Sequence, residues 1–274
     1  SLVKTLGHYC ANYLFEYHVP PLLRAVQIML KSSGNTIMGI EVLQDMEQVA
    51  DARTQLSIRG LGWKKSKLRG VMSKLRFLPR QPNIGDELKS WDVLKTVDFA
   101  IENLAPTDSV LDIGAFASEI LFVLHNAGFS NLSGIDLNPL LRTMPHADKI
   151  HYEITDFLST PFKDASFSLI TAISVIEHGY QPERLLAEVS RLLRPGGYFV
   201  ASFDYWPEKI ATDGIKMFDM DWKIFSRKDV RDLIEMARAQ GFEIFGSMDL
   251  DGGERPICCM DRHYTFAWMA LKRT

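Results

Sequence analysis

Short apolar runs alternate with helix-like patterns over the second two-thirds of the chain. Five of the runs have the length and composition of buried strands, at residues 109–113, 131–135, 150–154, 167–173 and 197–203. Between them, apolar residues recur at helical spacing over residues 119–127, briefly near Leu140, and over 181–193. Strands that alternate with helices form a parallel sheet with right-handed crossovers. The pattern therefore predicts an α/β fold with a doubly wound, mostly parallel sheet.

The C-terminal tail departs from this alternation. A helix is predicted over 226–240 and strands over 242–248 and 263–272, with the turn residues Gly252 and Gly253 between the two strands. Two successive strands without an intervening helix favour a hairpin. One of these strands is then expected to run antiparallel at the edge of the sheet.

The N-terminal third is expected to be helical. Helices are predicted over 13–17, 21–31 and 37–56, the last from apolar residues at Ile40, Leu43, Met46, Val49 and Ala50. Residues 78–83 have the composition of a linker, and a further helix is predicted over 91–104. These patterns divide the chain into a helical region over 1–88, which would cap a substrate or bind a partner, and an α/β domain over 89–274.

The stretch from Arg59 to Arg80 contains eight Lys and Arg residues and no acidic residue. One interpretation is the solvated face of a helical segment, which we prefer. The other is a cationic wall for an anionic substrate, so an anionic acceptor is one expectation.

Composition limits the class of protein. The chain has 274 residues, of which 46% are hydrophobic and 24% charged, as in a globular protein with one large domain and an appendage. A net charge of -3 gives no electrostatic reason to expect nucleic acid. The apolar stretches are too short to span a bilayer, and no secretory signal is recognisable. The three cysteines, Cys10, Cys258 and Cys259, have neither disulfide-framework nor metal-ligand spacing, and the histidines form no ligand cluster. We expect a cytoplasmic protein without a bound metal.

Polar residues and glycine follow the predicted strands at their carboxyl ends, where open α/β sheets bind ligands. Gly114 follows the first strand and lets the backbone approach a ligand. Asp136 ends the second strand about 20 residues later, where a carboxylate accepts hydrogen bonds from the ribose hydroxyls of a nucleoside. Asp156 ends the third strand and is placed to accept a hydrogen bond from an adenine amino group, with Leu137 and Phe157 covering the ring.

Five segments in this order resemble the motifs of class I (Rossmann-like) S-adenosylmethionine-dependent methyltransferases, and in particular the broad subgroup that methylates small molecules. They are 111–114 (Leu-Asp-Ile-Gly), 134–136 (Gly-Ile-Asp), 156–157 (Asp-Phe), 174–178 (Ser-Val-Ile-Glu-His) and 193–197 (Leu-Arg-Pro-Gly-Gly). The resemblance covers about residues 91–273. It implies a seven-stranded sheet whose last strand is antiparallel, and S-adenosyl-L-methionine as the cofactor bound by the domain over 89–274.

The resemblance also implies site residues. Those expected to bind the cofactor are Asp112, Gly114, Ala115, Asp136, Leu137, Asp156, Phe157 and Ser174. Glu177 and His178 are expected beside the reacting centre, where His178 acts as a base or packs without titrating. Two positions that are usually glycine in the first motif are here Phe116 and Ser118, which narrow or reshape the loop.

The predicted reaction is methyl transfer to a small molecule, first to a hydroxyl oxygen and otherwise to nitrogen or carbon. The aromatic and Met-rich stretch over 203–225 is expected to face the acceptor or to fill the core. Alternatives are a nicotinamide-dependent oxidoreductase, an aminopropyltransferase, and a methyltransferase-like binding module without activity. The first requires room for a pyrophosphate beside Phe116 and Ser118, and the second an acidic pair that the sequence does not show.

Overall fold

A computed structural model describes residues 38–63 and 82–274. The helices predicted over 13–17 and 21–31, Cys10 and most of the basic stretch lie outside these residues. Among the described helices, none combines the length and apolar character that a membrane span requires.

Five parallel strands form one side of a larger sheet and confirm the predicted doubly wound arrangement. They are β2 (Ser109–Ile113), β3 (Asn131–Asp136), β4 (Ile150–Ile154), β5 (Phe167–Ile173) and β6 (Leu193–Tyr205). Their spatial order is β4-β3-β2-β5-β6, with β4 at the edge of the sheet, so the chain proceeds to one side from β2 through β3 to β4 and to the other side with β5 and β6. The order reverses between β2 and β5, which makes their carboxyl ends the expected place for a ligand.

The C-terminal part of the chain supplies the predicted antiparallel strand, but this strand does not lie at the edge of the sheet, because β1 and β10 extend the sheet beyond it. β12 (Arg262–Arg273) runs antiparallel to β6, and β9 (Phe242–Ile244) pairs antiparallel with the end of β12. The strand predicted over 242–248 is broken at Gly246, whose φ is +105°. Its second part, β10 (Ser247–Met248), leaves β12 and pairs with β1 (Met38–Val42) instead. β11 (Ile257–Cys259) forms a hairpin with the start of β12.

The predicted helix over 37–56 is wrong in its first part. Residues 38–42 form β1, which pairs antiparallel with β12, and the helix α3 (Met46–Ile58) begins only after the cap residue Asp45. Ile40 and Val42 are buried with Glu41 between them, an alternation of period two that fits a strand. Pairing with a distant strand therefore decides the structure of this segment.

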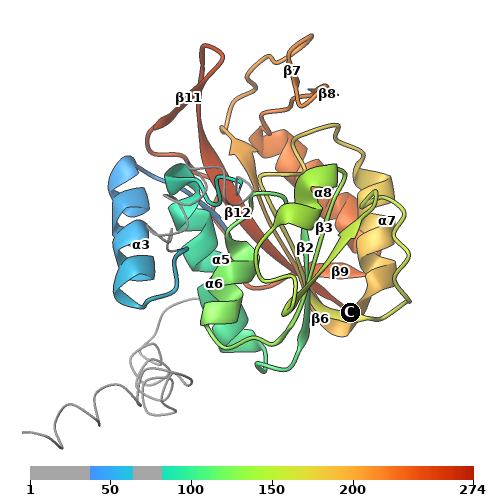
Figure 1. The fold of residues 1–274 in the computed structure, drawn as a ribbon. Coiled ribbons are helices and arrows are strands. Elements are labelled where there is room, and N and C mark those ends of the chain that lie inside the picture. The colour runs from blue at the N-terminus through green and yellow to red at the C-terminus, as the bar shows by residue number, and fades with distance from the viewer. Residues whose placement is uncertain (1–37, 64–81) are drawn as a thin grey trace, which may run out of the picture. The chain divides into compact units, whose positions relative to one another are not determined.

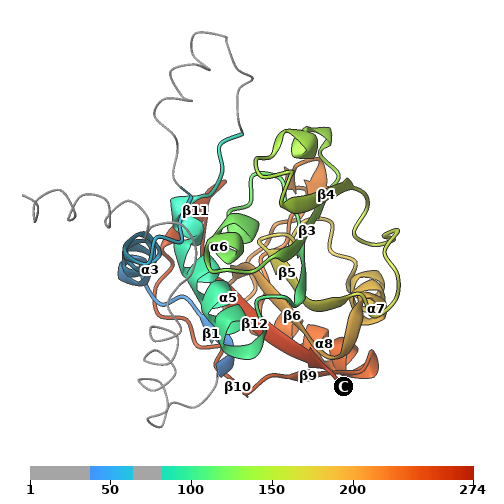
Figure 2. The same ribbon diagram turned by 60° about the horizontal axis from the view of Figure 1, so that its bottom comes forward.

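Helices cover both faces of the sheet, as Figures 1 and 2 show. On one face lie α3, α5 (Ser90–Asn103) and α6 (Ile120–Asn126); on the other lie α7 (Pro182–Leu192) and α8 (Arg227–Ala239). Successive strand residues point to opposite faces, so Val110 joins the core on the first face and Leu111 the core on the second. Two apolar cores thus hold the carboxyl ends of the strands in a rigid frame.

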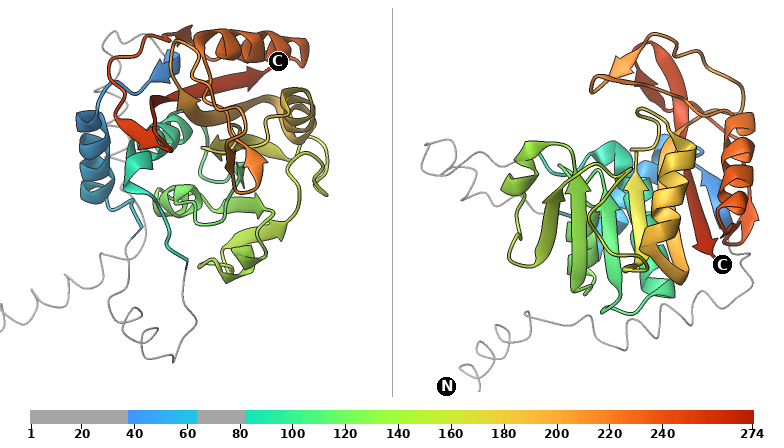
Figure 3. Two further views of the ribbon diagram at one scale, coloured as in Figure 1. Left: turned by 90° about the horizontal axis from the view of Figure 1, so that it is seen from above. Right: turned by 90° about the vertical axis from the view of Figure 1, so that its right-hand side faces the viewer.

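Two hairpins project beyond the carboxyl ends of the parallel strands (Figures 1 and 3). One is formed by β7 (Lys216–Met217) and β8 (Met220–Asp221), and the other by β11 with the start of β12. The turn between β7 and β8 consists of Phe218 and Asp219, both with positive φ, as in a two-residue hairpin turn. The short helix η1 (Glu87–Lys89) precedes α5, and η2 (Pro139–Thr143) follows β3.

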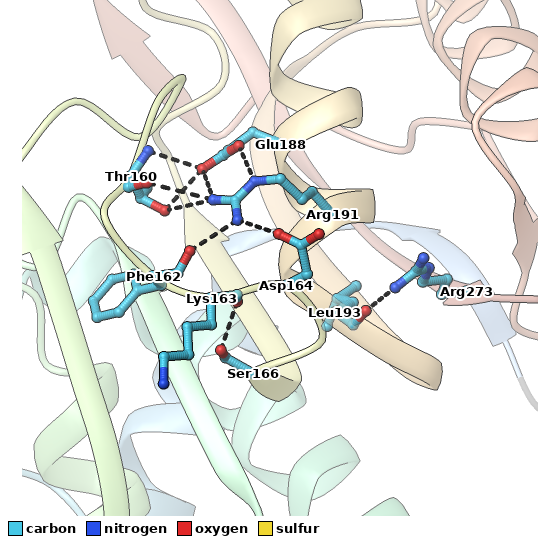
Figure 4. A network of polar contacts seen from close by, with 9 residues as sticks. All are labelled: Thr160, Phe162, Lys163, Asp164, Ser166, Glu188, Arg191, Leu193 and Arg273. Atoms are coloured by element: carbon cyan, nitrogen blue, oxygen red, sulfur yellow. Dashed lines mark hydrogen bonds and ion pairs between the residues drawn. The ribbon is translucent and has the colours of Figure 1, made fainter.

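A polar network holds the loop that follows β4 against α7 (Figure 4). The guanidinium of Arg191 pairs with Glu188 at 2.7 Å and with Asp164 at 2.6 Å, and it donates to the carbonyl oxygen of Phe162 at 2.8 Å. Glu188 also accepts from the backbone N–H of Thr160 at 2.8 Å. This network fixes the segment that leads from Asp156 back to β5.

Candidate active site

The loop after β2 turns sharply at Gly114, whose φ is +76°. A Cβ atom at this position would lie 2.5 Å from Cγ2 of Val175, closer than two carbon atoms approach. The backbone N–H groups of Gly114 and Ala115 both donate to the carbonyl oxygen of Ile135, at 2.9 and 3.0 Å. Glycine at position 114 therefore allows the loops after β2 and β5 to approach each other where the strand order reverses.

Asp136 lies at the end of β3 and faces the same loop. Its Oδ2 accepts from the backbone N–H of Phe116 at 3.0 Å, and its Oδ1 from that of Asn138 at 2.8 Å. Each carboxylate oxygen has a second lone pair, so this fixed carboxylate is able to accept two more hydrogen bonds.

Asp156 lies beyond the end of β4, next to the end of β3. The backbone N–H of Thr155 donates to the carbonyl oxygen of Asp136 at 3.2 Å, which joins the two strand ends. One carboxylate oxygen of Asp156 accepts from the N–H of Leu158 at 2.9 Å. Leu137 is 59% exposed, and Phe157 is partly buried against the core. The residues predicted to surround an adenine ring are thus carried by neighbouring strand ends.

Asp112 is buried within the site. One oxygen accepts from Oγ1 of Thr171 at 2.6 Å, while Oδ2 has no hydrogen-bond partner among the described residues. Burial raises the pKa of Asp112 to about 7, although hydrogen bonds from Thr171 and Ser118 oppose that shift. Ser118, at a position where glycine was expected, therefore interacts directly with this carboxyl group.

Ser174 begins the loop after β5 in a strained conformation, with a φ of +53°. Its backbone N–H donates to the carbonyl oxygen of Ser202 on β6 at 2.9 Å. Its Oγ is buried and has no hydrogen-bond partner among residues 38–63 and 82–274. A buried hydroxyl of this kind is suited to a polar ligand, because an unsatisfied polar group destabilises the folded protein.

The loop that contains Phe116 and Ser118 is held by contacts with residues upstream of it. The carbonyl oxygen of Ala117 accepts from the N–H of Gly85 at 3.0 Å, so the segment before η1 lies across the loop. The buried Glu119 pairs with Arg53 of α3 at 2.9 Å. Residues upstream of the predicted boundary at 88 thus contact the loop that follows β2.

Glu177 and His178 lie in the loop after β5. The backbone N–H of Lys223 donates to the carbonyl oxygen of Glu177 at 2.9 Å, which ties the stretch after β8 to this loop. Burial raises the pKa of Glu177 well above its usual value, and the neighbouring carboxylate of Asp204 adds to that shift. Burial and the nearby Lys89 lower the pKa of His178 to about 4, so its imidazole is neutral at neutral pH.

Asp92 and Asp204 accompany Glu177, and neither was predicted as a site residue. Asp92 is the third residue of α5 and was predicted only as part of an amphipathic helix. Asp204 follows the predicted end of the fifth strand at 203 and was included only in the acceptor-facing stretch. Both are buried, and both act electrostatically on Glu177. A polar residue in an amphipathic helix normally faces solvent, so no sequence pattern indicated Asp92 as a site residue.

Residues 111–201 match the model of a family described as a methyltransferase domain. Sterol methyltransferase-like 3 of Botryococcus braunii is 29% identical over 107 residues, which cover 36% of this chain and 27% of that protein. O-methyltransferase cnsE of Penicillium expansum is 28% identical over 123 residues, which cover 43% of this chain and 42% of that protein. The chain thus aligns with less than half the length of either relative.

The fold is shared with a solved geranyl diphosphate C-methyltransferase from Streptomyces coelicolor A3(2), whose structure contains Mg2+, geranyl diphosphate and S-adenosyl-L-homocysteine. The TM-score is 0.50 at 15% identity, and the match covers 71% of this chain and 86% of that one. At this identity the likeness shows the fold. The family match adds a sequence signature of a methyltransferase domain, over residues 111–201, to this Rossmann-like methyltransferase fold.

Proposed function

We propose that this protein transfers the methyl group of S-adenosylmethionine to a hydroxyl oxygen of a small molecule. The observation that carries the proposal is the set of polar groups at the reversal of strand order. Asp112 and Asp136 lie on one side of the loop at Gly114, and the Ser174 loop that leads to Glu177 and His178 lies on the other. Under this proposal the cofactor site and the acceptor site are adjacent.

The residues present suit the cofactor. The ribose hydroxyls would donate to the remaining lone pairs of Asp136, and the adenine would lie between Leu137 and Phe157, with its amino group at Asp156. The amino group of the methionine part carries hydrogens that the unpartnered oxygens of Asp112 and Ser174 are able to accept. Ala115 and Gly114 would contribute backbone to this part of the site.

S-adenosylmethionine supplies an electrophilic methyl group, so the protein has to position the acceptor in line with it and exclude water. Glu177 and His178 would contact the acceptor. A hydroxyl must lose its proton during transfer. The pKa of Glu177 is raised toward neutral pH, which favours general-base catalysis by this carboxylate. His178 is neutral and has an unpartnered Nδ1 among the described residues, so it would accept a hydrogen bond that orients the hydroxyl.

The region before residue 89 is proposed to cap the substrate. Its contacts with the loop after β2, through Gly85 and the Arg53–Glu119 pair, support a position beside the cofactor site. The expectation of an anionic acceptor rests on the basic stretch, of which residues 64–81 lie outside the described part of the chain. The carboxyl groups of the described site favour a positively charged acceptor instead.

The test is incubation of the full chain with S-adenosylmethionine and a panel of small hydroxyl compounds, followed by mass spectrometry. We expect one product whose mass has increased by one CH2 group, together with S-adenosylhomocysteine. The Asp136→Asn variant should bind S-adenosylhomocysteine at least about tenfold more weakly by calorimetry, because the charge-assisted hydrogen bonds to the ribose are lost. Asp148→Asn, in the exposed stretch before β4, serves as the matched control.

Failure of the wild-type protein to bind the cofactor would contradict the proposal. Binding without turnover of any hydroxyl, amine or carbon acceptor would instead support a binding module without activity. Hydride transfer in the presence of a nicotinamide cofactor would support the oxidoreductase alternative.

A further inference from the structure

Three buried carboxyl groups lie near enough to interact electrostatically beside the proposed acceptor position. Asp92 is contributed by α5, Glu177 by the loop after β5 and Asp204 by the end of β6, and their exposed fractions are 0%, 1% and 4%. Asp92 and Asp204 both act electrostatically on Glu177 and raise its pKa. We call these three residues the acidic cluster. They come from separate elements, so only the fold brings them together.

Two members of the acidic cluster have oxygens that nothing in the described chain satisfies. Oδ2 of Asp92 accepts from Oγ of Ser202 at 2.7 Å, but its Oδ1 has no partner among the described residues. Oε2 of Glu177 is likewise without a partner there. Asp204 differs, since its Oδ2 accepts from Nε1 of Trp222 at 2.8 Å and the hydroxyl of Tyr264 also bonds to it. Two buried acceptors thus remain available to a ligand.

The surrounding charge does not balance the acidic cluster. Lys89 is the basic side chain that acts on all three carboxyl groups, and its Nζ lies 3.2 Å from the centre of the Phe266 ring. Phe266 is the direct cross-strand neighbour of Asp204. One lysine offsets at most one of three carboxylates, and His178 is neutral. Burial of the remaining negative charge is unfavourable unless a positive group joins it.

A metal ion does not account for the arrangement. In residues 38–63 and 82–274, no group of three or more His, Cys, Asp or Glu side chains is arranged to hold a metal ion. The surroundings are instead those of an organic cation. Trp222, Tyr264 and Phe266 line the cluster, and aromatic rings attract positively charged nitrogen.

We propose that the acidic cluster is a subsite for a positively charged nitrogen of the acceptor, so that the methylated small molecule is a hydroxyl compound that also carries a protonated amine. The inference rests on the proposed function, because it assigns the substrate class of the same site. The amine would bind the free oxygens of Asp92 and Glu177, and the hydroxyl would lie at the His178 side of Glu177. The aromatic rings would exclude water around the amine.

Matched pairs of probes test this subsite without knowledge of the natural acceptor. We would load the full chain with S-adenosylhomocysteine and measure by calorimetry the binding of D-glucosamine against D-glucose, and of tyramine against tyrosol. In at least one pair the amine should bind about tenfold or more tightly than the neutral partner. Equal or undetectable binding of both members in both pairs would overturn the proposal.

Three variants show whether the preference comes from the acidic cluster. Asp92→Asn and Glu177→Gln should abolish the amine preference, whereas Asp108→Asn should keep it, because Asp108 pairs with Arg194 at 2.9 Å before the start of β2. The first two variants should also raise the midpoint of thermal unfolding of the ligand-free protein, since each removes a poorly compensated buried charge. A purely structural cluster would give lower midpoints and an unchanged preference, which would overturn the inference.

The same experiment separates failure of this inference from failure of the proposed function. Normal binding of S-adenosylhomocysteine without an amine preference removes only the amine subsite. Absence of cofactor binding in the wild type removes the proposed function as well. A third outcome, in which Glu177→Gln weakens binding of S-adenosylmethionine but not of S-adenosylhomocysteine or the amines, would assign the cluster to the sulfonium charge and overturn the inference.

Discussion

Gly114 shows how a single residue sets the geometry of the proposed cofactor site. Its φ of +76° and its closeness to Val175 mean that any side chain at this position is strained and also clashes. The loop cannot move away freely, because the N–H groups of Gly114 and Ala115 are bonded to Ile135.

Gly114→Ala should therefore lower both stability and cofactor affinity. We expect a loss of about 1–2 kcal/mol in the free energy of unfolding from the left-handed backbone alone, with a further loss from the contact with Val175. Urea denaturation and calorimetry with S-adenosylhomocysteine measure the two effects. Gly128→Ala has a positive φ of 97° but no atom near its Cβ, so it controls for backbone strain without the clash. Equal behaviour of the two variants would contradict this explanation.

At the scale of elements, α3 is joined to α6 by one largely buried ion pair. Arg53 donates to both carboxylate oxygens of Glu119, at 2.9 and 3.1 Å, and the Glu119 side chain is only 2% exposed. Oγ of Ser90 accepts from the same guanidinium at 2.8 Å, which extends the link to α5.

Arg53→Met should lower the free energy of unfolding by about 3 kcal/mol, because it leaves the Glu119 carboxylate buried without its positively charged partner. The double variant R53M/E119Q should recover much of that loss, which urea denaturation would reveal. Arg238→Met, which breaks an exposed pair with Glu235, should change the value by less than about 0.5 kcal/mol. A double variant no more stable than R53M would show that the loss comes from packing.

The elements that sequence patterns predicted well are the parallel strands and the helices between them. Buried parallel strands carry apolar runs with turn residues at their ends, so residues 109–113 and 167–173 were predicted with the observed bounds. The bounds of the edge strand over 150–154 were also predicted, although only Ile150 of that strand is fully buried. The segment 38–42 was predicted as helix because its apolar spacing suits either structure over so few residues. Its strand conformation depends on pairing with β12, which no local pattern encodes.

The candidate site likewise contains residues that could be predicted from the sequence and one that could not. Asp112, Asp136 and Asp156 lie at or just beyond the carboxyl ends of their strands. These ends meet at one edge of a parallel sheet, so the proximity of the three residues could be predicted. Asp92 enters the site from a helix on one face of the sheet. Its position depends on how α5 packs against β6, and helix packing is not readable from spacing alone.

For the whole molecule, buried carboxyl groups should make stability fall as pH rises. Burial raises the pKa of Asp92 to about 6 and that of Asp112 to about 7, against 3.8 in an unfolded chain. At pH values between 3.8 and the raised pKa of each group, the folded state keeps a proton that the unfolded state has released. The free energy of unfolding therefore decreases as pH rises through this window.

The Asp112→Asn variant should show a weaker decrease than the wild type, by up to roughly 2.5 kcal/mol between about pH 5 and about pH 8. Urea denaturation of the ligand-free protein at several pH values measures this difference. Glu188 does not interfere, because its bond with Arg191 lowers its pKa to about 2, so its contribution is lost only at lower pH. If the free energy of unfolding decreased equally with pH in the variant and the wild type, this would contradict a buried Asp112 with a raised pKa.

The proposed cofactor site is best examined in a crystal structure of the full chain with S-adenosylhomocysteine. We expect ribose hydroxyls within hydrogen-bonding distance of Asp136, the adenine between Leu137 and Phe157 with its amino group at Asp156, and the amino-acid end against Asp112 and Ser174. A nucleoside bound anywhere else, or Asp136 and Asp156 turned away from it, would show that the proposed site is wrong.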